Sequence, residues 1–338
     1  MRVKTVNFVC LITVLLCSCQ GVKENVRVLG MDEVRKLGGK SGFEVYAGNP
    51  VLKPGPEGTW DAGALGSMSV LKVEDVYHMY YEAWGRRSEK NWDATEYNTL
   101  QIGHATSKDG VHWVKDKNNP VLPKGDAGEW DRDGTWDPFV LFENGVFKMW
   151  YGGGNKECDW AFAVSQDGSH FTKRGRISRL GGVEDDHVVH DGNAGRYFMY
   201  YWDRKYEPLA LFRAHSTNET DFDFAHADGI RIDGEPYPAM YKFSHVIRDD
   251  AVWYMFYADF VRPHCPSSKT KVATSQDGLH WTLRNKNVLN GHDAEVLEVE
   301  KDLYLMYFGP NGYFDRKDCD IRLSVYNGKL SDLAVSKR

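Results

Sequence analysis

The chain has 338 residues, a formal net charge of −6 and a hydrophobic fraction of 42%. So mild a negative charge argues against a broad basic surface, and we expect no nucleic-acid partner. Its 33 glycines and its 11 Trp, 18 Tyr and 16 Phe residues favour many short strands and turns over long helices.

The first residues predict export. A short positive segment precedes an apolar stretch, residues 8–16, that is too short to span a bilayer comfortably as a helix. The segment Leu16-Cys17-Ser18-Cys19 resembles a bacterial lipobox, in which Cys19 becomes the first mature residue and carries the lipid. The alternative is an ordinary signal peptide that contains cysteines. We expect an exported protein that a lipid anchor alone holds to the bacterial cell envelope, on its periplasmic side or at the cell surface.

Three parts are predicted along the chain. Residues 1–18 form the signal peptide, residues 19–44 a tether and lead segment, and residues 45–338 one large domain. A short helix is predicted at residues 31–37. An oxidising compartment permits a disulfide, but the sequence does not choose a pair among three cysteines, Cys158, Cys265 and Cys319.

Internal repetition is the strongest signal in the large domain. The phrase NPVL at residues 49–52 recurs at 119–122, and GTWD at 58–61 recurs as GEWD at 128–131. Five later segments alternate aromatic and smaller residues, as a strand between two packed layers does. They are VYHMYY at 76–81, VFKMWY at 146–151, RYFMYY at 196–201, VWYMFY at 252–257 and LYLMYF at 303–308. Each follows a turn and another apolar segment, so we predict five hairpins.

A second phrase closes several of these units. Ser-x-Asp-Gly-x-His-aromatic occurs at residues 107–113, 165–171 and 275–281, and its Asp-Gly pair predicts a tight turn. Each unit then contains two hairpins, or four antiparallel strands. We predict an all-β fold, a five-bladed β-propeller. The alternative, a β-sandwich or jelly roll, does not require five similar units.

Acidic residues and histidines collect where the innermost strand of each blade is predicted to start. In a propeller these starts, and the loops after the second strands, surround one mouth, whereas the Ser-x-Asp-Gly turns lie on the opposite face. The predicted group contains Asp137, then Glu184, Asp185, Asp186 and His187, then His245, and finally His292, Asp293 and Glu295. The first blade has Ser67 at this position, with Asp61 six residues earlier.

Carboxylates that converge in a low-dielectric pore separate in pKa, which is what an acid and a base require. We therefore predict a catalytic set of Asp61, Asp137, Glu184, Asp185 and Glu295 for glycoside hydrolysis. Single strand-start aspartates are commonly turn or cap residues. For Asp61 an architectural role is an equal alternative, because Asp131 repeats it in the same phrase. No cofactor is expected to be required, although a structural cation such as calcium could occupy the pore.

The loops after the second strands combine aromatic side chains with Asp and Arg, which suits sugar faces and hydroxyls. For each loop aromatic, packing is the more common role. The residues predicted to bind substrate are Trp84, Arg86, Asp186, His187, Asp203, Arg204, His245, Arg262 and His292.

These phrases together make residues 45–330 similar to the five-bladed propeller glycosidases of families 32, 43, 68, 117 and 130. The resemblance implies that three acids at successive strand starts act as base or nucleophile, as stabiliser and as acid. Asp137, in the phrase Trp136-Asp137-Pro138, matches the stabiliser, and blade three would supply the acid. Ser67 departs from the pattern, which leaves Asp61 as the base or places the family in doubt. Some relatives use His as the acid, so His245 and His292 remain candidates.

The sequence thus predicts a monomeric, exo-acting glycosidase, inverting in mechanism, that removes terminal sugars from plant or algal oligosaccharides. One alternative is a phosphorylase of the family-130 type, in which Arg86, Arg204 and His245 would bind phosphate. Another is a lipoprotein that binds glycans without catalysis, which the serine at position 67 would favour.

Overall fold

The computed structural model describes residues 27–85, 100–154, 159–177, 183–192, 194–203, 210–235, 241–249, 251–259, 268–310 and 320–334. For residues 183–186, 241–244 and 259 it describes the backbone alone.

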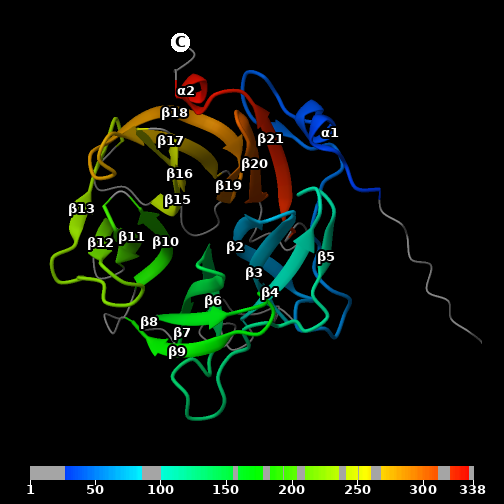
Figure 1. Cartoon of the computed structure of the whole chain (residues 1–338), viewed down its shortest axis with the longest axis vertical. Coiled ribbons are helices and arrows are strands. Elements are labelled where there is room, and N and C mark those ends of the chain that lie inside the picture. Colours follow the sequence, from blue (N-terminus) through cyan, green and yellow to red (C-terminus); the bar gives the residue numbers. More distant parts are fainter. Residues whose placement is uncertain are drawn as a thin grey trace, which may run out of the picture.

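Five separate sheets surround a central axis, and the innermost strands of all five meet there (Figure 1). Blade one contains β2 (Ala64–Val73), β3 (Val76–Trp84), β4 (Gln101–Ser107) and β5 (Trp113–Lys115). Blade two contains β6 (Thr135–Glu143), β7 (Val146–Gly153), β8 (Asp159–Ser165) and β9 (Thr172–Arg176). Blade three contains β10 (Val183–Asp191), β11 (Arg196–Asp203), β12 (Ala210–Ser216) and β13 (Asp228–Ile230).

Blade four contains β15 (Tyr241–Asp249), β16 (Val252–Asp259), β17 (Lys269–Ser275) and β18 (Trp281–Asn290). A short strand, β14 (Ile232–Asp233), pairs in parallel with β18 and makes this sheet five-stranded. Blade five contains β19 (His292–Glu300), β20 (Leu303–Gly309) and β21 (Arg322–Asn327). Its outer strand is β1 (Glu44–Val45), antiparallel to β21, so the two ends of the domain close the ring together. The predicted five-bladed propeller is therefore confirmed.

Two short helices accompany blade five. The helix α1 (Met31–Lys36) confirms the helix that was predicted in the lead segment, and α2 (Leu330–Leu333) follows β21. Among the described residues, none of the helices has the length and apolar character needed to cross a membrane.

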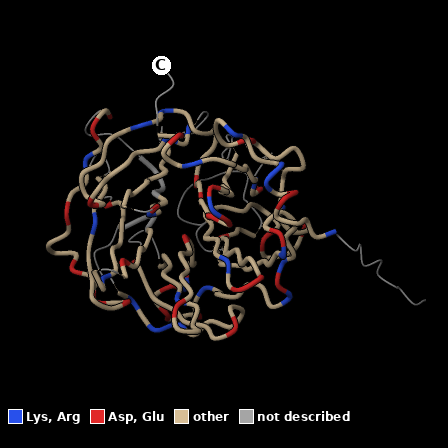
Figure 2. Tube along the Cα trace, turned by 45° about the horizontal axis from the view of Figure 1, so that its top comes forward, with Lys and Arg blue, Asp and Glu red and all other residues tan. Residues whose placement is uncertain are grey.

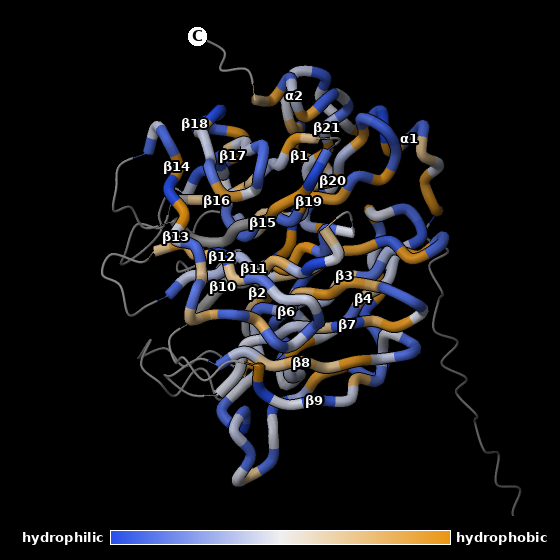
Figure 3. The backbone as a smooth tube through the Cα atoms, turned by 60° about the vertical axis from the view of Figure 1, so that its left-hand side comes forward, coloured by the Kyte–Doolittle hydropathy of each residue, from blue (hydrophilic) through white to orange (hydrophobic). Residues whose placement is uncertain are grey.

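The blades are held together by apolar residues of their second strands. Figure 3 shows apolar positions along the strands and hydrophilic positions in the loops. Each second strand contributes a methionine with no exposed surface, and these are Met79, Met149, Met199, Met255 and Met306. Because a strand turns alternate side chains to opposite faces, such a strand packs against the blade on either side. Burial of these layers is the main driving force for closing the ring.

The Ser-x-Asp-Gly turns connect blades one, two and four to their predecessors on the face opposite the mouth. In the first turn Ser107 Oγ accepts the N–H of Gly110 at 2.9 Å, while Asp109 accepts the N–H of His112 at 2.8 Å. A tyrosine hydroxyl from the preceding blade donates to the turn glycine's carbonyl. These bonds are Tyr307 to Gly110 at 2.7 Å, Tyr80 to Gly168 at 2.9 Å and Tyr200 to Gly278 at 2.8 Å. The repetition of this phrase therefore serves the architecture.

Candidate active site

All five innermost strands carry an irregularity in register near their start. The shifts fall between Leu65 and Met68, Trp136 and Phe139, Glu184 and His187, Lys242 and His245, and His292 and Glu295. A bulge sets two residues of one strand against one of its partner and re-aims a side chain. Five bulges at one end of the axis therefore mark the mouth as the part of the ring where the regular pairing of the inner strands is interrupted.

Three of the five bulges carry an aspartate at the same register position. These residues are Asp137 of blade two, Asp185 of blade three and Asp293 of blade five. Asp137 has a φ of 43° and Asp293 a φ of 54°, both in the left-handed region. That conformation costs a non-glycine residue about 1–3 kcal/mol and persists where the surroundings enforce it. The fold therefore holds two aspartates in a strained backbone at one mouth.

The sequence comparison placed Asp293 at the start of its inner strand but left it out of the catalytic set. A second irregularity in β19, between Glu298 and Glu300, obscures its equivalence to Asp137. Counting back from the buried methionine of each second strand sets Ala294, rather than Asp293, opposite Asp137. The extra residue of the second bulge moves the true equivalence by one. A bulge inside a strand leaves no mark in hydrophobic periodicity that would reveal this shift.

Asp293 is buried, and its two carboxylate oxygens differ. Oδ2 lies 3.0 Å from His292 Nδ1, whereas Oδ1 has no hydrogen-bond partner among the described residues. The imidazole of His292 packs over Gly309, where an added Cβ would come within 2.6 Å of the ring. Buried carboxylate oxygens normally have a hydrogen-bond partner, so Oδ1 is a candidate acceptor for a hydrogen bond from a bound ligand.

Glu82 is a second residue that the prediction did not include. It lies near the end of β3 and is 6% exposed, and its Oε2 accepts the backbone N–H of Asp137 at 3.0 Å. A Cβ added to Gly66 would lie 2.1 Å from Glu82 Oε1, so the carboxylate covers that glycine. In blades two and five the corresponding second-strand residues are glycines, Gly152 and Gly309. Blades three and four have tryptophan and alanine there, so an acid at a position that is uncharged in the other four blades was the signal available in the sequence.

Asp61 lies in contacts that its repeat, Asp131, also makes. Asp61 forms an ion pair with Lys115 of β5, and Asp131 forms one with Lys173 of β9 at 2.7 Å. Both aspartates are buried, and each lysine comes from the outer strand of its blade. This matched pairing favours the architectural alternative for Asp61.

Glu295 lies one layer below the bulges, in what we call the axial layer. This layer comprises the inner-strand residues that pair with the aromatic residue after each buried methionine, namely Ser69, Phe139, His187, His245 and Glu295. Glu295 Oε1 accepts the N–H of Val70 at 3.0 Å, and Oε2 lies 2.5 Å from His245 Nδ1. Both of its oxygens are therefore engaged by groups within the ring, and a catalytic role for Glu295 stays a prediction.

The two histidines of the axial layer are likewise buried instead of lining a substrate surface. His187 Nε2 donates to the carbonyl of Val246 at 2.9 Å, and the His187 and His245 rings lie 4.4 Å apart between centroids. Burial, followed by the proximity of His245, holds the pKa of His187 well below its usual range, so this imidazole is neutral. We therefore assign both histidines to the axial layer.

The remaining predicted residues are placed unevenly. Trp84 ends β3 and packs with Leu100 and Trp136, while Asp203 ends β11 and is buried. For Glu184 and Asp186 the backbone lies in β10 on either side of Asp185. Other predicted residues lie outside the described part of the chain, and these are Arg86, Arg204, Arg262, Cys19, Cys158, Cys265 and Cys319.

Comparison with known proteins gives the following relatives. No protein-family model matches the chain. Uncharacterized protein Rv1502 of Mycobacterium tuberculosis is 28% identical over 166 residues, which cover 45% of this chain and 52% of that protein. Sucrose-6-phosphate hydrolase of Escherichia coli is 29% identical over 190 residues, 50% of this chain and 36% of that enzyme. The chain thus spans about half or less of the curated relatives it matches.

Solved structures match over nearly the whole chain. The β-1,2-mannobiose phosphorylase of Listeria innocua has a TM-score of 0.66 and 15% identity, covering 86% of this chain and 98% of that one. The family 117 glycoside hydrolase Zg3597 of Zobellia galactanivorans has a TM-score of 0.63 and 14% identity, covering 88% and 93%. The chain therefore has the five-bladed propeller fold that solved glycoside hydrolases and a glycoside phosphorylase share.

Proposed function

We propose that this protein is a glycoside hydrolase whose reactive carboxyl groups lie at the mouth of the propeller. The observation that carries the proposal is the aspartate that three inner strands present at one bulge position, Asp137, Asp185 and Asp293. Glycoside hydrolysis uses one carboxylic acid to protonate the leaving oxygen and one carboxylate to activate water or attack carbon. The glycoside hydrolases among the solved structures of this fold support the same class of reaction.

We assign Asp137 and Asp185 to the reaction, with Asp293 as the third carboxyl group. Glu82 is a positioning residue, because its carboxylate receives the N–H of Asp137 and so fixes that residue's left-handed backbone. Blade one then contributes through its second strand, which accounts for the serine at its own strand start. Displacing a reacting group by 1 Å costs about 10²-fold in rate, so such support has catalytic weight.

The proposed enzyme is inverting and acts on chain ends of plant or algal oligosaccharides. Inverting enzymes hold their two carboxyl groups about 6.5–9.5 Å apart so that a water fits beside the sugar. Carboxyl groups from separate blades suit such a spacing better than neighbours on one strand. Exo action is part of this proposal, and it is supported by the ring of five inner strands around one axis, where a terminal sugar would enter more easily than a mid-chain unit.

Turnover of defined substrates tests this function. Purified protein is incubated with aryl glycosides and oligosaccharides, with and without inorganic phosphate, and products are separated by chromatography. We expect phosphate-independent release of terminal sugars, and Asp137→Asn and Asp185→Asn should each lose about 10²–10⁴-fold in kcat/KM. Asp167→Asn, in a turn on the opposite face, is the matched control and should retain activity.

Three outcomes would contradict the proposal. Turnover that requires phosphate would identify a phosphorylase, and glycan binding without turnover would identify a binding protein. Full activity in both mouth variants would remove the assigned residues.

We also propose that the chain is exported and anchored through lipid on Cys19. Cells that express the full chain are labelled with a palmitate analogue and fractionated. The wild type should carry the label and sediment with membranes, whereas Cys19→Ala should do neither. A labelled Cys19→Ala variant would overturn the anchor assignment.

A further inference from the structure

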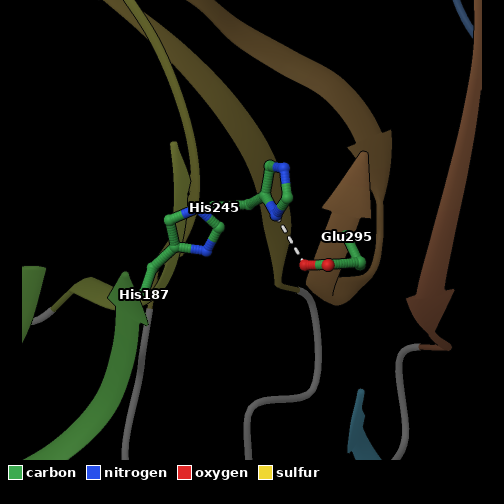
Figure 4. Close-up of side chains that lie close together, drawn as sticks. All are labelled: His187, His245 and Glu295. Carbon is green, nitrogen blue, oxygen red and sulfur yellow. Dashed lines mark hydrogen bonds and ion pairs between the residues drawn. The ribbon is translucent and has the colours of Figure 1, made fainter. Parts of the chain in front are cut away.

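The axial layer contains a buried group of ligand-forming side chains that the proposed reaction does not use. His187, His245 and Glu295 come from β10, β15 and β19, three consecutive blades, and their exposed fractions are 5%, 7% and 6%. One ligand atom from each lies within 4.8 Å of the other two, a grouping found nowhere else in the described part of the chain. Figure 4 shows the three side chains directed toward one another.

Hydrogen bonds define which atoms are available. Because His187 Nε2 donates to the carbonyl of Val246, the lone pair of this imidazole is on Nδ1. Figure 4 shows one ring nitrogen of His187 directed toward the space between His245 and Glu295. The backbone N–H of Val70 holds Glu295 Oε1 at 3.0 Å and leaves Oε2 facing His245 Nδ1. The orientations of His187 and Glu295 are therefore set from outside the cluster, and His245 is oriented by its contact with Glu295.

A hydrogen-bonded pair alone does not account for the whole cluster. His245 Nε2 has no hydrogen-bond partner among the described residues, although its residue is buried. Leaving a buried polar atom unpaired is unfavourable, and an ion pair inside a protein must also overcome the loss of hydration of both charges. A cation bound between His187 Nδ1, His245 Nδ1 and Glu295 Oε2 would replace this ion pair, and His245 Nε2, on the far side of its ring from Glu295, would then carry the imidazole proton.

We propose that His187, His245 and Glu295 bind a divalent transition-metal ion of the zinc type. Imidazole nitrogen is a ligand for zinc, copper, nickel and iron, whereas calcium and magnesium are bound by sets of oxygen atoms. Two histidines and one glutamate make three protein ligands, a number that leaves a fourth tetrahedral position for water. Two ligand atoms on tetrahedral zinc lie about 3.3 Å apart, so small side-chain rotations bring these atoms into place.

The metal would join blades three, four and five at the axis. Blades one and two have Ser69 and Phe139 in this layer, and Ser69 Oγ instead accepts the N–H of Val140 at 3.1 Å. The ring would thus be tied by a hydrogen bond on one side and by the metal on the other. Stability and metal content report this role without reference to substrate turnover, so its failure is distinct from failure of the proposed function.

Metal content and thermal unfolding test the proposal. The mature protein is stripped with a chelator, dialysed and titrated with ZnCl₂ or CaCl₂, and bound metal is measured by plasma mass spectrometry. We expect one zinc per chain and a rise in Tm of about 5 °C at a hundredfold excess over Kd. His187→Asn and Glu295→Gln should lose the bound zinc and the rise, whereas His280→Gln, in an exposed turn, should keep both.

A second readout uses only the wild-type protein, in case the variants fold poorly. Cobalt(II) replaces zinc, and a tetrahedral site with nitrogen ligands gives intense visible absorption that zinc then abolishes. Absence of that spectrum together with absence of zinc uptake would overturn the proposal. So would a Tm rise that calcium produces and zinc does not, or zinc uptake unchanged in both axial variants.

Discussion

The two ends of each blade use aspartate in opposite ways. On the face opposite the mouth, Asp109, Asp167 and Asp277 each accept two backbone N–H groups and contact a histidine three residues later. The side chain of His170 and the N–H of Ser169 hold the pKa of Asp167 well below its usual range. At the mouth, by contrast, Asp293 has an oxygen without a described partner.

This contrast teaches how to interpret repetition. Residues that recur with identical bonds in several blades maintain the architecture. Acids that share a position in several blades but differ in their hydrogen bonds, or that stand alone among uncharged equivalents, are the candidates for catalysis. Charged residues of both signs occur around the whole ring (Figure 2).

The largest expected effect comes from exchanging one aspartate on each face. Asp293→Asn should lower kcat/KM by about 10²-fold or more. Its Tm should be unchanged or higher, because the substitution removes a buried charge that is only partly hydrogen-bonded. Asp277→Asn should do the reverse, with activity retained and Tm lowered, because a charge-assisted bond to His280 is lost. Steady-state kinetics and calorimetry measure the two effects. Equal loss of activity in both variants would break the comparison.

The next effect concerns Glu82, the acid at a second-strand position that is uncharged in the other four blades. Glu82→Ala should lower kcat by about 10²-fold with little change in KM, because the N–H of Asp137 loses its acceptor. Glu82→Gln is the matched control and should retain most activity, since its amide oxygen still accepts that N–H. If the glutamine variant is as impaired as the alanine variant, the charge itself takes part in the reaction.

The sequence was sufficient for the fold because its signals are local and repeated. Turn residues, alternating strands and the buried methionines recur in each blade, so the ring and its four-stranded sheets could be predicted. Closure of blade five by β1 could not, because a two-residue strand carries no periodic pattern. At the mouth the sequence predicted the position of Asp137, whereas the equivalence of Asp293 to Asp137 was obscured by a second bulge in β19.

Sequence position also misplaced residues that differ only in depth along the axis. Glu295 follows Asp293 by two residues, yet it belongs to the axial layer and bonds to the backbone of blade one. Asp61 was ambiguous in the sequence, and its ion pair with Lys115 could be recognised only when the outer strand of blade one was in place. Such contacts join residues far apart in the chain, and no local pattern encodes them.

A smaller effect is expected from the bonds between blades on the architectural face. Tyr307 donates to the carbonyl of Gly110 across the closure between blades five and one. Tyr307→Phe removes this buried bond and should cost about 1–2 kcal/mol, or about 3 °C in Tm, with catalysis unchanged. Urea and thermal unfolding measure the loss. An unaltered Tm would mean that the ring closes without support from this turn.

The smallest effect is a change in the pH dependence of stability at the interface of blades one and two. His78 Nδ1 lies 3.0 Å from His104 Nε2, and His104 Nδ1 lies 3.0 Å from Asp116 Oδ2. Burial, followed by the nearby His104, lowers the pKa of His78 to about 4, and burial also lowers the pKa of His104.

The folded protein therefore keeps His78 neutral at pH values where the unfolded chain, with an ordinary histidine pKa of about 6.5, binds a proton. Stability is complete above that pH and falls as the pH decreases toward 4, since the unfolded state gains protons that the folded state excludes. His78→Gln removes one such proton, so the slope of unfolding free energy against pH between 6.5 and 4 should decrease. Urea titrations at four pH values in this window measure the slope. A slope equal to that of the wild type would show that acid acts on this interface through another group.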